Sequence, residues 1–126
     1  MVQLNKYLRE IGIDENYWLF KKNQNDSRYE PDEEGFIPAE YFNLDTTLAI
    51  IIYSSLRYFK DNCNYGYPGY MTQEQWDKCL DDMIAAFRLL ITIEKDNLTK
   101  TQSKNKEKKI KYGLRLFAKH FNNLWY

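Results

Sequence analysis

The segment from Thr72 to Ile91 constrains the fold more than any other part of this 126-residue chain. Thr72 followed by Gln75 is a capping box, in which two side chains satisfy backbone amides at the start of a helix. Apolar residues then recur every three or four positions, which places them on one helical face. They are Trp76, Cys79, Leu80, Met83, Ile84, Phe87, Leu90 and Ile91. Because such a helix has to pack against other apolar helices, the chain is predicted to be all-α.

A second long helix is predicted over residues 44–59, where Asn43 or Asp45 can cap the first turn. Its main apolar stripe consists of Leu44, Leu48, Ile51, Ile52, Ser55, Leu56 and Phe59. Ala49, Ile50 and Tyr53 extend the apolar surface round the helix. A helix that is apolar on most sides is central in a bundle, or it lies at a subunit interface.

Two more helices complete the predicted bundle. Residues 4–11 show the spacing of a short helix, which Gly12 can end. Residues 110–125 carry the apolar stripe of a last long helix, with the only histidine, His120, on its polar side. The fold class is therefore a small helical bundle of about three long helices plus a short N-terminal helix. The length predicts a single helical domain, 1–126.

Two segments interrupt the helical pattern, and they carry opposite charges. Proline and glycine break residues 22–40 into an irregular acidic arm, in which Asp26 to Glu40 holds six acidic side chains. Residues 96–108 read as a polar connector, and Lys100 to Lys111 holds six lysines. The two segments either stay solvated or attract each other, within the fold or between subunits.

Composition and motifs argue against several classes of protein. Basic and acidic residues balance at 18 each, unlike in a general binder of nucleic acid or of anionic membranes. The longest apolar run, LAIIIY, is too short to span a bilayer. Two cysteines and one histidine are too few for a Cys/His zinc site, and no cofactor is expected. A reducing cytoplasm with free thiols is the expected setting.

Motifs for catalysis are also missing from the sequence. There is no phosphate-binding Gly-rich loop, no nucleophile elbow and no metalloprotease motif. Asp77, Asp81 and Asp82 share the polar side of a helix start, where the helix macrodipole stabilises carboxylates. We therefore expect a protein that is not an enzyme.

The candidate binding site is the loop NYGYPGY at residues 64–70. Its Pro68–Gly69 pair suits a type II turn with positive φ at the glycine. Tyrosine rings can stack on a nucleotide base, and Arg57, Lys60 and Arg88 on the flanking helices can bind its phosphate. The same rings suit a protein interface, or they cover the core as a lid. The predicted ligand-binding residues are Asp45, Arg57, Lys60, Tyr65, Tyr67, Tyr70 and Arg88.

Five motifs occur in the order LDxTLA (44–49), LRxFK (56–60), GxP (66–68), TxExWDxxLDxMIxxF (72–87) and GLxLFxKxFxNLW (113–125). Through them, residues 41–126 resemble a widespread family of small bacteriophage proteins. The resemblance implies a phage gene acting in the host bacterial cytoplasm. Small phage proteins of this kind often counter host defence, and that likeness is one of class only.

Two functional hypotheses follow. The first is a non-catalytic counter-defence protein that sequesters a nucleotide immune signal, ADP-ribose-type or cyclic dinucleotide, in a pocket of a homo-oligomer. In it, Asp45 accepts a hydrogen bond from a ribose hydroxyl or an adenine amine. The alternative is an anti-CRISPR-like, protein-binding inhibitor of a host defence effector, whose acidic arm imitates nucleic-acid charge. A virion or assembly component is a third class.

Overall fold

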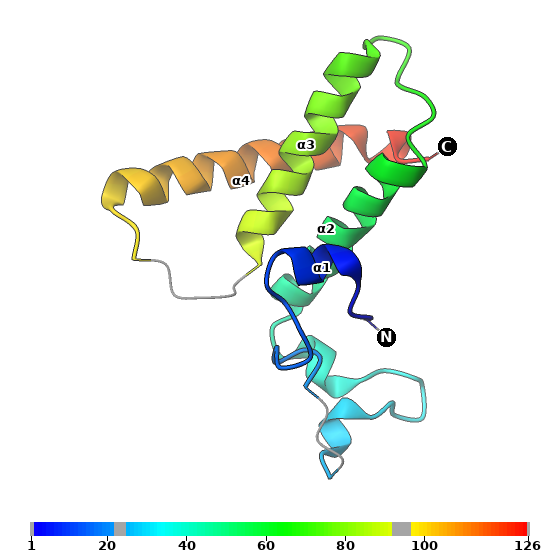
Figure 1. The fold of residues 1–126 in the computed structure, drawn as a ribbon, viewed down its shortest axis with the longest axis vertical. Helices are drawn as coiled ribbons and strands as arrows, with labels where there is room; N and C mark the ends of the chain where they lie inside the picture. Colours follow the sequence, from blue (N-terminus) through cyan, green and yellow to red (C-terminus); the bar gives the residue numbers. More distant parts are fainter. Residues whose placement is uncertain (1, 22–24, 92–96, 126) are drawn as a thin grey trace.

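The computed structural model describes residues 2–21, 25–91 and 97–125, and within these the protein is all-α, as predicted. The α-helices are α1 (Lys6–Glu10), α2 (Leu44–Asn62), α3 (Gln73–Leu90) and α4 (Lys100–His120). Three 3₁₀ turns are η1 (Ser27–Tyr29), η2 (Pro38–Tyr41) and η3 (Phe121–Asn123). Figure 1 shows α2 beside α3, and α4 crossing α3 at a steep angle. None of the described helices is both long enough and apolar enough to cross a membrane.

The short helix α1 forms as its sequence predicts. The side chain of Asn5 accepts hydrogen bonds from the amides of Tyr7 and Leu8, at 3.0 and 3.2 Å. Gly12 follows the helix with a φ of +90°, a left-handed conformation that glycine adopts without strain. Tyr7 and Leu8 are buried, so α1 covers one end of the core that α2 and α3 form.

Helix α3 lies at the centre of the bundle and contacts both α2 and α4. The predicted capping box is present, with Gln75 N–H donating to the Thr72 hydroxyl and Thr72 N–H donating to the Gln75 side chain. Its buried residues are Trp76, Cys79, Leu80, Met83, Ala86 and Phe87. The predicted stripe therefore faces the core of the protein.

Gly113 lets α4 pack closely against α3. A Cβ atom at this position would lie 2.7 Å from the carbonyl oxygen of Asp82 and would collide with the side chain of Ala86. No residue larger than glycine fits there without moving a backbone. The crossing point of the two helices is thus set by a single glycine.

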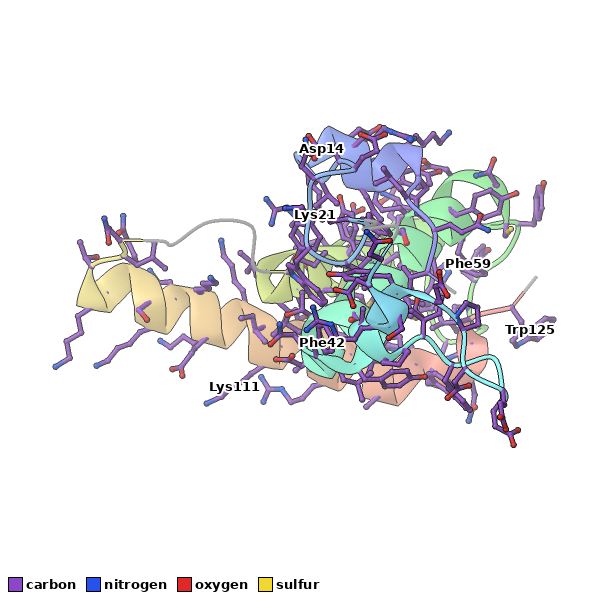
Figure 2. The ribbon with its side chains drawn as sticks, turned by 90° about the horizontal axis from the view of Figure 1, so that it is seen from below. Asp14, Lys21, Phe42, Phe59, Lys111 and Trp125 are labelled. Atoms are coloured by element: carbon purple, nitrogen blue, oxygen red, sulfur yellow. The ribbon has the colours of Figure 1, made fainter. Side chains whose placement is uncertain are left out.

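The prediction of a polar connector over 96–108 is wrong from Lys100 onward, because α4 begins there. Thr99 and Gln102 form a second capping box, and lysine, glutamine and glutamate favour helices. Residue 96 lies outside the described residues. Figure 2 shows the lysine-rich half of α4 extending away from the rest of the protein, with Lys111 on its outer side.

Helix α2 buries a different face from the one its main stripe predicts. The buried residues are Thr46, Thr47, Ala49, Ile50, Tyr53 and Leu56. Leu44, Leu48 and Ile51, at the start of the predicted stripe, are exposed. A helix that is apolar on most sides has no unique inner face in its sequence, so contacts with α1 and α3 decide which side is buried. The side chain of Asn43 makes no capping hydrogen bond, and Asp45 lies in the first turn.

The described part of the acidic arm, residues 25–40, is irregular apart from the two 3₁₀ turns η1 and η2. Asp32 organises its loop, because its carboxylate accepts hydrogen bonds from the amides of Glu34 and Phe36, both at 2.9 Å. Glu40 accepts a hydrogen bond from the amide of Val2. The arm lies at the N-terminal end of α2, and the lysine-rich half of α4 projects from another side of the molecule (Figure 1).

Candidate functional site

The tyrosine loop between α2 and α3 presents its rings to solvent. Tyr65, Tyr67 and Tyr70 are 80, 53 and 67% exposed, so they do not form the lid on the core that was one alternative. The turn also differs from the prediction. Met71 N–H donates to the carbonyl of Pro68 at 2.9 Å, and Gly69 has no positive φ. The loop is therefore closed by a turn that begins at Pro68.

The C-terminal segment completes a groove with this loop. Tyr65, Gly66, Tyr67 and Pro68 line a groove of about 260 Å³ together with Asn123 and Trp125. Trp125 is 74% exposed and stands at the edge of the molecule in Figure 2. We call Tyr65, Tyr67 and Trp125 the aromatic platform. Sequence reasoning missed Asn123 and Trp125, because it continued the last helix to residue 125, whereas α4 ends at His120 and gives way to η3.

His120 holds the tyrosine loop against the end of α4. It is 1% exposed, so the prediction that it lies on a polar face is wrong. Its Nδ1 lies 3.1 Å from the Tyr70 hydroxyl, and its ring lies edge-on to Trp76, with centroids 5.6 Å apart. Asn123 donates to the same hydroxyl at 3.2 Å. Burial, and secondarily the charge of Lys119, lowers the pKa of His120, which favours the neutral imidazole.

Arg57 joins α2 to α1. Its guanidinium donates to Glu10 and to the Tyr53 hydroxyl, each at 2.8 Å. It also lies over the ring of Tyr7, 4.8 Å from the centroid. This cation is therefore paired and stacked within the fold, and its role in ligand binding stays a prediction.

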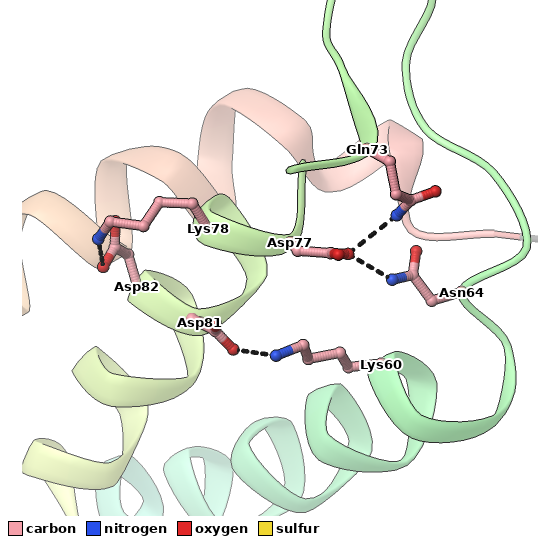
Figure 3. Close-up of polar contacts among 7 residues, drawn as sticks. All are labelled: Lys60, Asn64, Gln73, Asp77, Lys78, Asp81 and Asp82. Atoms are coloured by element: carbon pink, nitrogen blue, oxygen red, sulfur yellow. Dashed lines mark hydrogen bonds and ion pairs between the residues drawn. The ribbon is translucent and has the colours of Figure 1, made fainter. Parts of the chain in front are cut away.

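Lys60 and the carboxylates of α3 are also paired with neighbours (Figure 3). Lys60 binds Asp81, which joins α2 to α3. Asp77 accepts hydrogen bonds from Asn64 at 2.8 Å and from Gln73 at 2.9 Å. Lys78 pairs with Asp82 one turn further along the same helix. The three carboxylates thus serve three separate structural contacts, and Asp77 fixes the start of the tyrosine loop.

The remaining predicted residues lie at helix ends. Arg88 is in the last turn of α3, about 22 Å along the helix from Gln73, where the tyrosine loop joins it. Asp45 is in the first turn of α2, about 25 Å from the end of that helix at Asn62. The structure therefore places Tyr65 and Tyr67 on one groove and Tyr70 beside His120, and it separates Asp45 and Arg88 from this loop within one chain.

The part of the chain that the structure describes contains two free cysteines. No group of three or more histidine, cysteine, aspartate or glutamate side chains is placed to hold a metal ion there. Cys63 and Cys79 are free, and burial raises the pKa of the Cys79 thiol. A raised pKa keeps the thiol protonated and unreactive at neutral pH.

Comparisons of the chain with protein-family models, with curated proteins and with solved structures find no match.

Proposed function

We propose that this protein is a non-catalytic binding protein that captures another protein through its aromatic platform. The observation that carries the proposal is the exposure of Tyr65, Tyr67 and Trp125 around one groove. Tyrosine and tryptophan provide large contact areas at a small cost in side-chain entropy, and they are enriched at the centres of protein interfaces.

Hydrogen bonds hold the loop that carries the aromatic platform, and this order favours binding. Tyr70 is held by both His120 and Asn123, while Asn64 ties the beginning of the loop to Asp77. A surface that is ordered before binding loses less entropy when a partner docks. The loop that carries Tyr65 and Tyr67 is therefore anchored at both ends, at Asn64 and at Tyr70.

The positions of the cations favour a protein over a phosphorylated ligand. Arg57 and Lys60 are bound by Glu10 and Asp81, so a phosphate would have to displace a carboxylate from each of them. Sequestration of a nucleotide signal remains the second candidate. It is favoured by the pairing of aromatic rings with the Asn123 side-chain amide in the groove, because rings can stack on a base while the amide bonds its edge.

The setting we propose is that of a phage counter-defence protein in the host bacterial cytoplasm, acting on a host defence effector as a homo-oligomer. It rests on the five motifs named above. In this proposal the acidic arm contributes attraction at long range. Glu33 and Glu34 are exposed, whereas Asp32 is engaged in holding its own loop. Charge reversal at Glu33 and Glu34 thus tests the arm without disturbing its backbone.

The experiment compares three tagged proteins in lysate of the bacterial host: the wild type, the double variant Tyr67→Ala/Trp125→Ala, and the control Tyr112→Ala. Tyr112 is 48% exposed and lies on α4. We expect one host protein to bind the wild type and the control and to be lost with the double variant. Native mass spectrometry of the wild type with cyclic nucleotides and ADP-ribose derivatives tests the second candidate. Equal capture by all three proteins, with no nucleotide retained, would refute both candidates.

A further inference from the structure

We propose that α4 binds duplex DNA in the major groove, through the phosphates and without reading the base sequence. The inference is independent of the function proposed above, because it concerns a different surface from the aromatic platform. We call this surface the basic stripe. It consists of Lys100, Lys104, Lys108, Lys111, Arg115 and Lys119.

The basic stripe runs along one face of α4. Its members lie four, four, three, four and four positions apart, the spacing that places side chains on one side of a helix. All six are exposed. The opposite side of the helix carries Gly113 and His120, which are buried, and Phe117, which packs on Phe87. The basic stripe therefore faces solvent, and at 1.5 Å per residue it is about 28 Å long.

The balanced charge of the whole chain conceals this surface. Of the 18 basic and 18 acidic residues, α4 carries eight basic ones and a single acidic one, Glu107, which leaves ten basic and seventeen acidic residues elsewhere. A local field of one sign attracts a polyanion even when the net charge is zero. The acidic arm lies on another side of the molecule (Figure 1), so its carboxylates do not neutralise the basic stripe.

None of the six cations is paired within the part of the chain that the structure describes. The cations of the ion pairs there are Arg9, Arg28, Arg57, Lys60 and Lys78. Glu107 borders the basic stripe, but it forms no ion pair with a described residue. An external anion therefore displaces no carboxylate when it binds here, in contrast to Arg57 and Lys60.

Three members of the basic stripe border one groove. Lys108, Lys111 and Arg115 line a groove of about 530 Å³ together with Tyr112 and Leu114. Tyr112 is 48% exposed, and tyrosine hydroxyls donate to phosphate oxygens in protein–DNA complexes. Three cations and one hydroxyl are thus available to a single stretch of an anionic chain.

The composition of the basic stripe fits a nucleic acid better than a protein or a membrane. Lysine is depleted at protein interfaces, and five of the six members are lysines. A helix that lies on a membrane inserts an apolar face, and the apolar face of α4 packs against α3. Nucleic-acid backbones, by contrast, are bound mainly through lysine and arginine. The matching ligand is a polyanion that needs no apolar contact.

The shape of α4 selects duplex DNA among the nucleic acids. Its lysine-rich half extends away from the rest of the protein (Figure 2), so the body of the protein does not block access to it. An α-helix with its side chains is about 10–12 Å across, and the major groove of B-DNA is about 12 Å wide. The major groove of duplex RNA is too narrow. Proteins that bind single strands stack the bases on aromatic rings, which the members of the basic stripe lack. Lysine binds phosphate as a point charge, so no sequence preference is expected.

Fluorescence anisotropy of the full chain with a labelled duplex of random sequence tests the proposal. We expect a dissociation constant of about 10⁻⁴–10⁻⁶ M at physiological salt, as in non-specific binding. Lys108→Gln/Lys111→Gln/Arg115→Gln should weaken binding more than about tenfold, and it should flatten the plot of log K against log salt by about 0.9 for each lost contact. Glutamine is close to lysine in helix propensity, and circular dichroism checks that α4 stays folded. A wild type that does not bind DNA at about 50 mM salt would overturn the proposal.

The matched control removes the same charge from another part of the surface. Lys6→Gln/Arg9→Gln/Lys21→Gln changes three exposed cations on α1 and in the segment that follows it. Because these cations lie outside the basic stripe, we expect the dissociation constant to change less than about threefold and the salt dependence to stay the same. Equal losses in the two triple variants would show that only the total charge matters, and they would refute the site.

Competition identifies the kind of polyanion. Unlabelled duplex DNA, duplex RNA of the same sequence and polyglutamate are each added, at equal charge concentration, to the complex with labelled DNA. We expect unlabelled DNA to displace the label at the lowest concentration. Polyglutamate that is as effective as DNA would show that the partner is an acidic protein surface and would overturn the choice of ligand. Equal displacement by duplex RNA would overturn the placement of α4 in the major groove.

Discussion

The hydroxyl of Tyr70 lies 3.1 Å from Nδ1 of His120, and this contact joins a loop to a helix end fifty residues further along the chain. The imidazole is buried against Trp76, so the loop is anchored to the core through a polar bond at its edge. The same hydroxyl accepts from Asn123, next to the groove of the aromatic platform. His120 therefore helps to hold the tyrosine loop, and with it the candidate binding surface, in place.

The stability of the protein should fall in mild acid because of His120. Burial lowers the pKa of this imidazole below its ordinary value of 6.5. Well above pH 6.5 the imidazole is neutral in both the folded and the unfolded state, and the full stability is present. Below that value the unfolded chain takes up a proton before the folded protein does, so the free energy of unfolding declines until the pH reaches the folded pKa. Urea unfolding between about pH 7.5 and 5.5 should show a steeper loss for the wild type than for His120→Gln. Equal losses would contradict this account.

Gly113→Ala should destabilise the fold. The added methyl group meets the Asp82 carbonyl and the Ala86 side chain, and forcing an extra carbon into packed helices costs about 1–3 kcal/mol. The better helix propensity of alanine offsets up to about 1 kcal/mol of this. Chemical denaturation measures the difference. The matched control is Gly66→Ala, where an added Cβ has open space and the change should stay within about 0.5 kcal/mol. Similar values for both variants would argue against the close approach of α3 and α4.

The two capping boxes should differ in their effect on global stability. Thr72 caps α3 in the core, so Thr72→Ala should lower the free energy of unfolding by about 1 kcal/mol. Thr99 caps the first turn of α4, where the following residues are mostly exposed. Thr99→Ala should therefore lower the helical circular dichroism signal and leave the unfolding midpoint nearly unchanged, because that half of α4 can fray alone. Equal midpoint shifts would show that the lysine-rich half of α4 unfolds together with the core.

Arg57→Ala should lower the free energy of unfolding. The side chain bonds Glu10 and Tyr53 and covers the ring of Tyr7. Its removal should cost about 1–2 kcal/mol, mostly through the ring contact and the bond to Tyr53. The ion pair itself should contribute less than about 1 kcal/mol, because Glu10 is half exposed. A double-mutant cycle with Glu10→Ala separates these contributions, and a coupling energy well above 1 kcal/mol would contradict the assignment.

Sequence patterns predicted the elements that are stabilised locally. Thr72 and Gln75 lie three residues apart, and Gly12 follows the apolar spacing of residues 4–11, so local spacing was enough to place both helices. The start of α4 carries the same kind of signal in Thr99 and Gln102. The run of lysines that follows obscures this signal, because such a run also predicts a solvated connector.

The candidate site could not be predicted to the same extent, because it depends on contacts between distant residues. Arg57 meets Glu10 across 47 positions, and Tyr70 meets His120 across 50. Local sequence shows that Arg57 is near the tyrosine loop along the chain, but it does not show which acid holds it. The exposed face of α2 could not be predicted for a related reason. Only the packing of α1 and α3 against this helix determines which of its apolar sides is buried.

Site-specific photo-cross-linking shows whether the aromatic platform contacts a host protein. A photoreactive amino acid replaces Tyr67 in one variant and Tyr112 in another, and each is produced in the bacterial host. Both positions are about half exposed, at 53 and 48%. We predict one cross-linked host protein at position 67 and none at position 112. The same product at both positions, or none at position 67, would contradict the claim.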